Sequence, residues 1–188
     1  MSAFSNLHAI ATFWYRPIQT VRGLVEQGQG HAVACANAGL LGMVTSLRFC
    51  LGSAEGAAAM FYWLPAGFFG GLGILYFLAL LVRNFGRWLG GHARLQAIRT
   101  ALGMACLPWL LLCCLLTASL FSGMDAAAVA SFWPVFFVLF IYSYVLLLLS
   151  VMTVLGIGAL RTTLTLAISF VVAFFLLSAI ARVFFSPV

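Results

Sequence analysis

Five long apolar stretches fill most of this 188-residue chain, and nearly all of its charged residues lie in the segments between them. A run of about 20 apolar residues is long enough for an α-helix to cross the hydrocarbon core of a bilayer. The chain is 65% hydrophobic and only 6% charged, whereas soluble globular domains carry about 25% charged residues. The sequence therefore predicts an all-α fold, a polytopic membrane bundle of transmembrane helices.

The apolar runs set the predicted spans. The five predicted spans are His31–Gly52, Leu64–Val82, Ala101–Phe121, Phe132–Leu155 and Thr162–Phe185. Arg48 falls inside the first span, but a long side chain near a helix end can extend its guanidinium to the headgroups. We therefore divide the chain into an N-terminal segment, 1–30, and a transmembrane domain, 31–188.

The segment before the first span has mixed polarity. After Pro17, four apolar residues recur at helical spacing, namely Ile18, Val21, Leu24 and Val25. Pro17 suits the first turn of a helix, and Gly28 with Gly30 suits its end. This pattern predicts a short amphipathic helix that lies at the membrane interface. The segment lacks the charged, apolar and small-residue regions of a signal peptide, so we expect the N-terminus to be retained.

The arginines predict how the chain is oriented. All nine basic residues are Arg. With a cytoplasmic N-terminus, seven of them lie on the cytoplasmic side and only Arg48 and Arg182 on the other. The positive-inside rule thus predicts the N-terminus inside and the C-terminus outside. Because the arginines flank spans rather than form a polar module, they indicate anionic lipid as a partner and no nucleic acid.

Small residues and prolines indicate where helices meet. Ala34, Ala38 and Gly42 repeat at one-turn spacing in the first span, and Gly67 and Gly71 in the second. Such stripes let helix backbones approach closely in lipid, although a chain this rich in Gly and Ala also produces some pairs by chance. Pro108 interrupts the third span, where a kink that shapes a cavity and plain packing are equally compatible with the sequence.

Three short segments resemble sequence motifs of a known family. They are Trp14–Thr20, Leu89–Leu95 and Gly103–Pro108. Read with the span order, they make the chain similar to the Yip1 domain family of five-span membrane proteins, and its short, Arg-only sequence looks like a bacterial member. The resemblance implies the fold, a membrane location and structural roles for Trp14, Pro17, Gly90, Gly91, Gly103 and Pro108. Met104 stands where the family motif usually has Tyr.

The chemical inventory argues against an enzyme. Glu26, Glu55 and Asp125 are the only acidic residues, and all fall in connections rather than at mid-membrane, which disfavours a proton relay. The sequence also lacks the residue sets that intramembrane hydrolases need, which are paired carboxylates, a His pair or a Ser with a nearby base. The five cysteines have no metal-site spacing. We predict no catalytic residue, no cofactor and no metal.

Two groups of residues remain as candidate contact sites. The predicted cytoplasmic group is Arg83, Arg87, Trp88, Arg94 and Arg99, with Arg94 and Arg99 on the second connection. It is expected either to bind an anionic lipid or an acidic partner segment, or to serve topology alone. The outer group is Arg48, Glu55, Asp125 and Arg182, which either form an ion pair between span ends or remain separately solvated.

The leading functional hypothesis follows from these sites and the resemblance. We expect a non-enzymatic membrane protein, in a bacterial inner membrane, that organises lipids or other membrane proteins through its basic face. The alternative is a channel, or a lipid or small-molecule transport protein, with an uncharged conduit of Ser, Thr and Gly. The sequence leaves homo-oligomer formation open.

Overall fold

The computed structural model describes residues 3–28, 30–52, 56–122 and 130–185. Within them, five helices are long and apolar enough to cross a membrane, which confirms the predicted number and order of spans. They are α3 (Gly30–Gly52), α4 (Gly56–Trp88), α5 (Leu95–Phe121), α7 (Trp133–Leu155) and α8 (Ala159–Phe185). The protein is an all-helical membrane bundle.

Helix α4 extends beyond its predicted span at both ends, and α5 extends beyond its predicted span at its start. With 33 residues, α4 is about 50 Å long, whereas the hydrocarbon core is about 30 Å thick. In addition, α5 begins at Leu95 rather than Ala101. The placement of Arg99 on the connection was therefore wrong: Arg99 lies within the first two turns of α5. Hydropathy marks the apolar part of a helix, but helical hydrogen bonding continues beyond that part.

Helix α3 lies between α4 and α5 and makes close contact with both. A Cβ atom on Gly42 would overlap the carbonyl oxygen of Gly67, and one on Gly71 would overlap that of Ala38. On the other side of α3, a Cβ atom on Gly103 would overlap Ala34. These contacts confirm the packing role predicted for the small residues, because only residues without bulk allow helix backbones to approach so closely.

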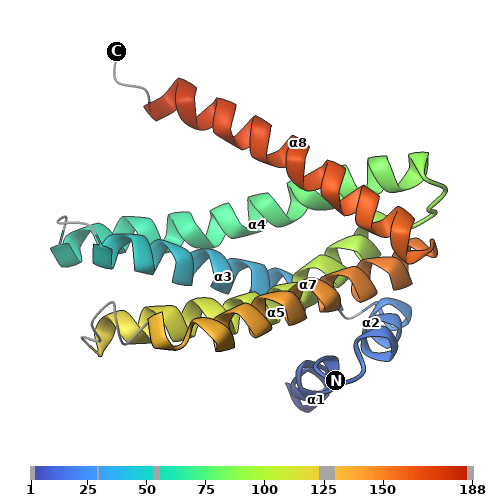
Figure 1. The fold of residues 1–188 in the computed structure, drawn as a ribbon, viewed down its shortest axis with the longest axis horizontal. Coiled ribbons are helices and arrows are strands. Elements are labelled where there is room, and N and C mark those ends of the chain that lie inside the picture. The colour runs from blue at the N-terminus through green and yellow to red at the C-terminus, as the bar shows by residue number, and fades with distance from the viewer. Residues whose placement is uncertain (1–2, 29, 53–55, 123–129, 186–188) are drawn as a thin grey trace.

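The remaining spans complete the bundle unevenly. Helix α7 packs against α5, and α8 packs against α4 and α7. Figure 1 shows that α8 runs beside α4 near its own start and then diverges from it towards the C-terminus. The face of α8 that meets the bundle has small or hydroxyl-bearing residues, including Thr165, Ser169 and Ala173. Its later aromatic residues, such as Phe174 and Phe175, are exposed.

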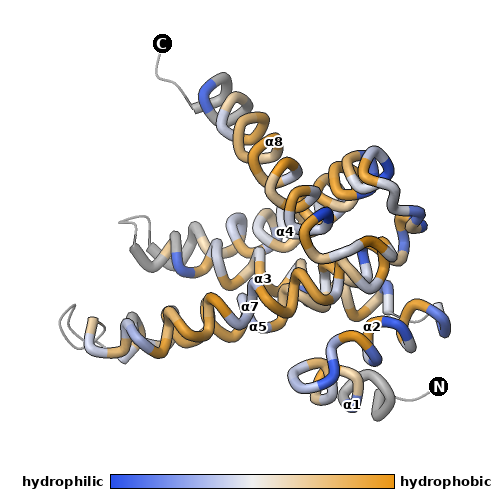
Figure 2. Tube along the Cα trace, turned by 45° about the vertical axis from the view of Figure 1, so that its right-hand side comes forward, coloured by the Kyte–Doolittle hydropathy of each residue, from blue (hydrophilic) through white to orange (hydrophobic). Residues whose placement is uncertain are grey.

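The N-terminal segment folds into two helices that dock against the bundle. The helix predicted after Pro17 is present as α2 (Pro17–Glu26), with Pro17 in its first turn. Its apolar residues Val21 and Leu24 are buried, and α2 packs against α7 and α5. Its position at the membrane interface stays a prediction. Figure 2 shows its alternating hydrophobic and hydrophilic residues. An additional helix, α1 (Ala3–Phe13), was not predicted. Between them, Trp14 stacks on Tyr142 of α7, whose hydroxyl donates a hydrogen bond to the Trp14 carbonyl.

Candidate functional site

Most of the arginines gather at one end of the bundle, which we call the basic end. Figure 1 shows that α2, the α4–α5 connection and the start of α8 all lie at this end, and Figure 2 shows hydrophilic residues concentrated there. Its arginines are Arg16, Arg22, Arg83, Arg87, Arg94, Arg99 and Arg161. Glu26 is the only acidic residue within the described ranges. The basic end therefore has a strong excess of positive charge.

The Gly-Gly pair builds the turn that holds these arginines together. Gly90 has φ +93°, a left-handed conformation in which other residues are strained. The Gly91 amide donates to the Gly86 carbonyl over 2.8 Å, and the Gly90 amide donates to the Arg87 carbonyl over 3.2 Å. This pair of bonds is a Schellman motif, which satisfies the last carbonyls of α4.

At Gly91, close packing rather than backbone conformation leaves little room for a side chain. A Cβ atom there would lie 3.3 Å from the Leu155 carbonyl oxygen and 3.1 Å from that of Gly86. The α4–α5 turn is therefore packed against the end of α7. An ideal Cβ on Gly90 would also lie 3.8 Å from a terminal guanidinium nitrogen of Arg161. Arg161, at the start of α8, thus joins the basic end beside the turn, although the candidate group predicted from sequence did not include it.

Two arginines of the basic end are half-buried. Arg83 on α4 and Arg99 on α5 each have a buried Nε atom that has no hydrogen-bond partner among the described residues. A guanidinium is planar, always charged and suited to bidentate contacts with phosphate or carboxylate. A buried donor without an acceptor is destabilising by roughly 1–3 kcal/mol. These two side chains are the feature of the basic end that most favours an anionic ligand.

Arg99 belongs to a contact between three helices. Its guanidinium carbon lies 4.5 Å from the centre of the Tyr76 ring on α4, which is a cation–π contact. The Tyr76 hydroxyl lies 3.3 Å from Nε2 of His31, and the two rings meet edge to face with centroids 6.2 Å apart. His31 is the second residue of α3. Neither His31 nor Tyr76 was singled out in this role from sequence.

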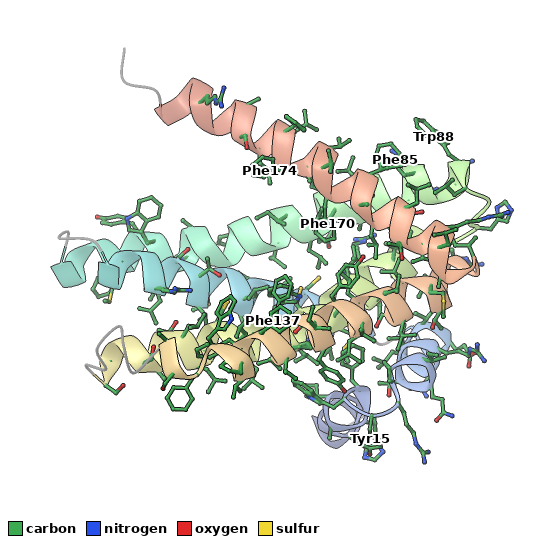
Figure 3. The ribbon with its side chains drawn as sticks, in the orientation of Figure 1. Tyr15, Phe85, Trp88, Phe137, Phe170 and Phe174 are labelled. Carbon is green, nitrogen blue, oxygen red and sulfur yellow. The ribbon has the colours of Figure 1, made fainter. Side chains whose placement is uncertain are left out.

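The other predicted contact residues are exposed. Arg87 and Arg94 lie on the surface at the end of α4 and just before α5. The Trp88 side chain is 80% exposed and meets Phe85 edge to face, with ring centroids 5.2 Å apart. Figure 3 shows Phe85 and Trp88 near the C-terminal end of α4. Tryptophan is enriched at membrane interfaces, and the role of Trp88 as an interfacial anchor stays a prediction.

The outer group is only partly described. Arg48 and Arg182 are exposed, near the ends of α3 and α8 that lie away from the basic end. Glu55 and Asp125 lie outside the described residues. The ion pair considered for this group stays a prediction.

The family-motif residues of α5, Gly103 and Pro108, lie in the packed interior of the bundle. Asn37 of α3 is buried and donates from Nδ2 to the Gly103 carbonyl over 3.3 Å. This bond crosses the seam where Gly103 meets Ala34. Pro108 is fully buried inside α5. Because proline has no amide hydrogen, it cannot donate to the carbonyl of Met104 one turn earlier.

Several hydroxyl groups inside the bundle donate hydrogen bonds to backbone carbonyls of their own helices. Ser150 donates to the Leu146 carbonyl, Thr162 to that of Gly158, and Ser169 to that of Thr165. Each of these side chains is fully buried. Their hydrogen bonds therefore satisfy them within one helix, which lets polar residues lie at helix contacts without a polar ligand.

Comparison with known proteins agrees with the three motifs. The family profile described as the Yip1 domain matches residues 11–180, from the end of α1 to the last turns of α8. Searches of curated proteins and of solved structures gave no match. The matched region includes Trp14 and Pro17, the Gly-Gly turn and the Gly103–Pro108 segment. The chain is therefore an integral membrane protein that belongs to the Yip1 domain family.

Proposed function

We propose that this protein is a non-enzymatic member of its family that gathers anionic lipids, and through them other membrane proteins, at its basic end. By the positive-inside rule, this end faces the cytoplasm of a bacterial cell and the C-terminus faces outward. The observation that carries the proposal is the pair of buried, unsatisfied Nε atoms on Arg83 and Arg99. A phosphate or carboxylate oxygen supplied by a ligand would satisfy them.

The surroundings of this pair support a headgroup rather than an internal partner. Glu26 is the only carboxylate in the described part of the chain, and it is exposed on α2. Topological signalling requires only charge near a span end, so it does not explain half-buried guanidinium groups. An anionic surface attracts each nearby Arg by about 1 kcal/mol. The exposed Arg87 and Arg94 would add attraction, and the half-buried pair would add directional hydrogen bonds.

Native mass spectrometry of the protein in a mild detergent tests the proposal. In the variant with Arg83, Arg87, Arg94 and Arg99 all replaced by Gln, we expect retained phosphatidylglycerol to fall. Loss of charge attraction alone, at about 1 kcal/mol per arginine, corresponds to about a thousandfold loss of affinity for the four changes together. The lost hydrogen bonds of the half-buried Arg83 and Arg99 add to this figure. The same spectra report the oligomeric mass and any co-purified membrane protein.

The matched control replaces Arg48 and Arg182 by Gln, because these arginines lie at the other end of the bundle. A reporter enzyme that is active only outside the cytoplasm, fused after Val188, checks that each variant keeps its orientation. We expect the control variant to retain phosphatidylglycerol as the wild type does. Equal retention by the wild type and the four-arginine variant would contradict the proposal and leave those arginines with a topological role alone.

A further inference from the structure

An apolar cavity of about 630 Å³ lies inside the bundle, and all five spans contribute to its lining. Specific small-molecule sites have volumes of roughly 300–1,000 Å³, so the space is large enough for a ligand. Every lining residue falls within a helix segment that is long and apolar enough to cross a membrane. The surroundings from which this cavity draws an occupant are therefore lipid chains rather than water.

The lining has little to offer a polar ligand. The lining residues on α3 include Ala38 and Gly42, and those on α5 include Cys106 and Trp109. Thr45 is one of three lining residues with a hydroxyl, and that hydroxyl donates to the Leu41 carbonyl of its own helix over 2.7 Å. A hydrocarbon chain matches this surface because it needs no hydrogen bonds.

The cavity opens sideways between helices. Several of its lining residues are substantially exposed, among them Ile74 on α4, Tyr144 on α7 and Phe170 on α8. Figure 3 shows Phe170 at the side of α8 that faces the rest of the bundle, close to where α8 diverges from α4. A lipid chain could thus enter from the bilayer without crossing a polar layer.

One end of the cavity lies at the depth of the half-buried arginine. The lining residue Leu102 is one turn after Arg99 on α5, which is about 4.5 Å along the helix axis. On α4, Tyr76 lies between the lining residues Ile74 and Leu78 in sequence. The guanidinium that stacks on Tyr76 therefore lies at the depth of this end of the apolar space, although neither Arg99 nor Tyr76 lines the cavity itself. A phospholipid presents its phosphate and its acyl chain in the same order of depth.

We propose that the cavity holds one acyl chain of an anionic glycerophospholipid whose phosphate is bound by Arg99. This inference rests on the proposed function, and it identifies the ligand as a single intercalated lipid rather than a diffuse layer of headgroups. Charge complementarity at Arg99 selects the headgroup, and the apolar lining holds the chain. The lipid then becomes part of the packed interior between α4, α5 and α8.

The test uses two phospholipid probes that carry the same diazirine in the middle of one acyl chain. One probe is phosphatidylglycerol and the other phosphatidylcholine, each in vesicles of phosphatidylcholine and phosphatidylglycerol. After illumination, peptide mass spectrometry maps the label. We expect the phosphatidylglycerol probe to label buried lining residues such as Ala38 and Ala105, which are only 4% and 2% exposed. Phe137, exposed on α7, reports contact with ordinary surrounding lipid.

Helix α4 supplies a matched pair of variants that fill or spare the cavity. Gly70 lines it and Gly73 does not, yet a Cβ atom on either glycine would meet nothing within 4 Å. We expect Gly70→Phe to lose most of the interior label and to keep the label at Phe137. Gly73→Phe should keep both. Ala66→Phe, which also adds bulk to the lining, provides a second blocking variant should Gly70→Phe fold poorly.

Arg99→Gln tests the connection between chain and headgroup. We expect it to lower interior labelling by phosphatidylglycerol to the level given by phosphatidylcholine. Interior label that is absent in the wild type, or that survives both blocking variants, would overturn the inference. So would equal interior labelling by the two probes. If lipid retention still depends on the arginines while the interior stays unlabelled, the proposed function holds and only the intercalated chain is rejected.

Discussion

At the residue scale, two glycines have different structural roles. Gly103 of α5 lies so close to α3 that an added Cβ would stand 2.6 Å from the Ala34 carbonyl oxygen. Gly73 of α4 faces open space. Gly103 therefore fixes the distance between two helices, whereas Gly73 leaves its helix more flexible than alanine would.

This difference predicts opposite outcomes for one substitution. Gly103→Ala should separate α3 from α5 and strain the Asn37 hydrogen bond, and we expect a destabilisation of about 1–3 kcal/mol. Gly73→Ala should leave stability unchanged or raise it by up to about 1 kcal/mol through helix propensity. Thermal unfolding in one detergent, followed by circular dichroism, compares the two variants. Equal melting temperatures would mean that the α3–α5 seam tolerates expansion.

Residues of the site differ in how far the sequence could identify them. Arg83 and Arg87 stood out as charges that end an apolar run, and the structure places both on α4. Tyr76 could not be singled out, because it is one aromatic among many within a span. Its partner His31 is 45 positions away. Local periodicity carries no information about such contacts between helices.

At the scale of elements, the α4–α5 turn is the piece that assembles the basic end. It reverses the chain within a few residues, because Gly90 adopts a left-handed conformation and Gly91 fits beneath the Leu155 carbonyl. Arg87, Arg94 and Arg161 are brought together by this turn and its contact with the start of α8. The shape of the turn, rather than its charge alone, thus determines how the arginines are presented.

Gly90→Ala should therefore weaken both the fold and the site. A left-handed conformation destabilises an L-residue by roughly 1–2 kcal/mol relative to glycine, and we expect a loss of stability of that size. Phosphatidylglycerol retention should fall with it, although no charge is removed. Gly23→Ala, at an unobstructed position inside α2, serves as the control. Unchanged melting and lipid retention in Gly90→Ala would show that the turn is not required.

Element number and order were predictable, but element ends were not. Length and hydropathy identify five spans because a bilayer imposes a minimum apolar run. They do not reveal that α4 continues to Trp88, since its end is set by the Schellman hydrogen bonds of the glycine turn. The α1 helix escaped prediction because its segment mixes polar and apolar residues.

The whole molecule combines a tightly packed side with an open one. Close glycine and alanine contacts join α3 to α4 and α5, whereas α8 diverges and leaves access to an apolar cavity. The lining and volume of the cavity could not be predicted from sequence, because they depend on how five helices are spaced. Pro108 left a kink that shapes a cavity and plain packing equally open, and the lining residues Cys106 and Trp109 lie on either side of it.

The most direct test of the central claim compares two pairs of arginines at the basic end. Each pair is replaced by Gln, and phosphatidylglycerol binding is titrated by native mass spectrometry. Loss of the half-buried Arg83 and Arg99 should weaken binding by at least about tenfold more than loss of the exposed Arg87 and Arg94, a difference of about 1.4 kcal/mol. Equal effects of the two pairs would contradict a built headgroup site and indicate attraction by net charge alone.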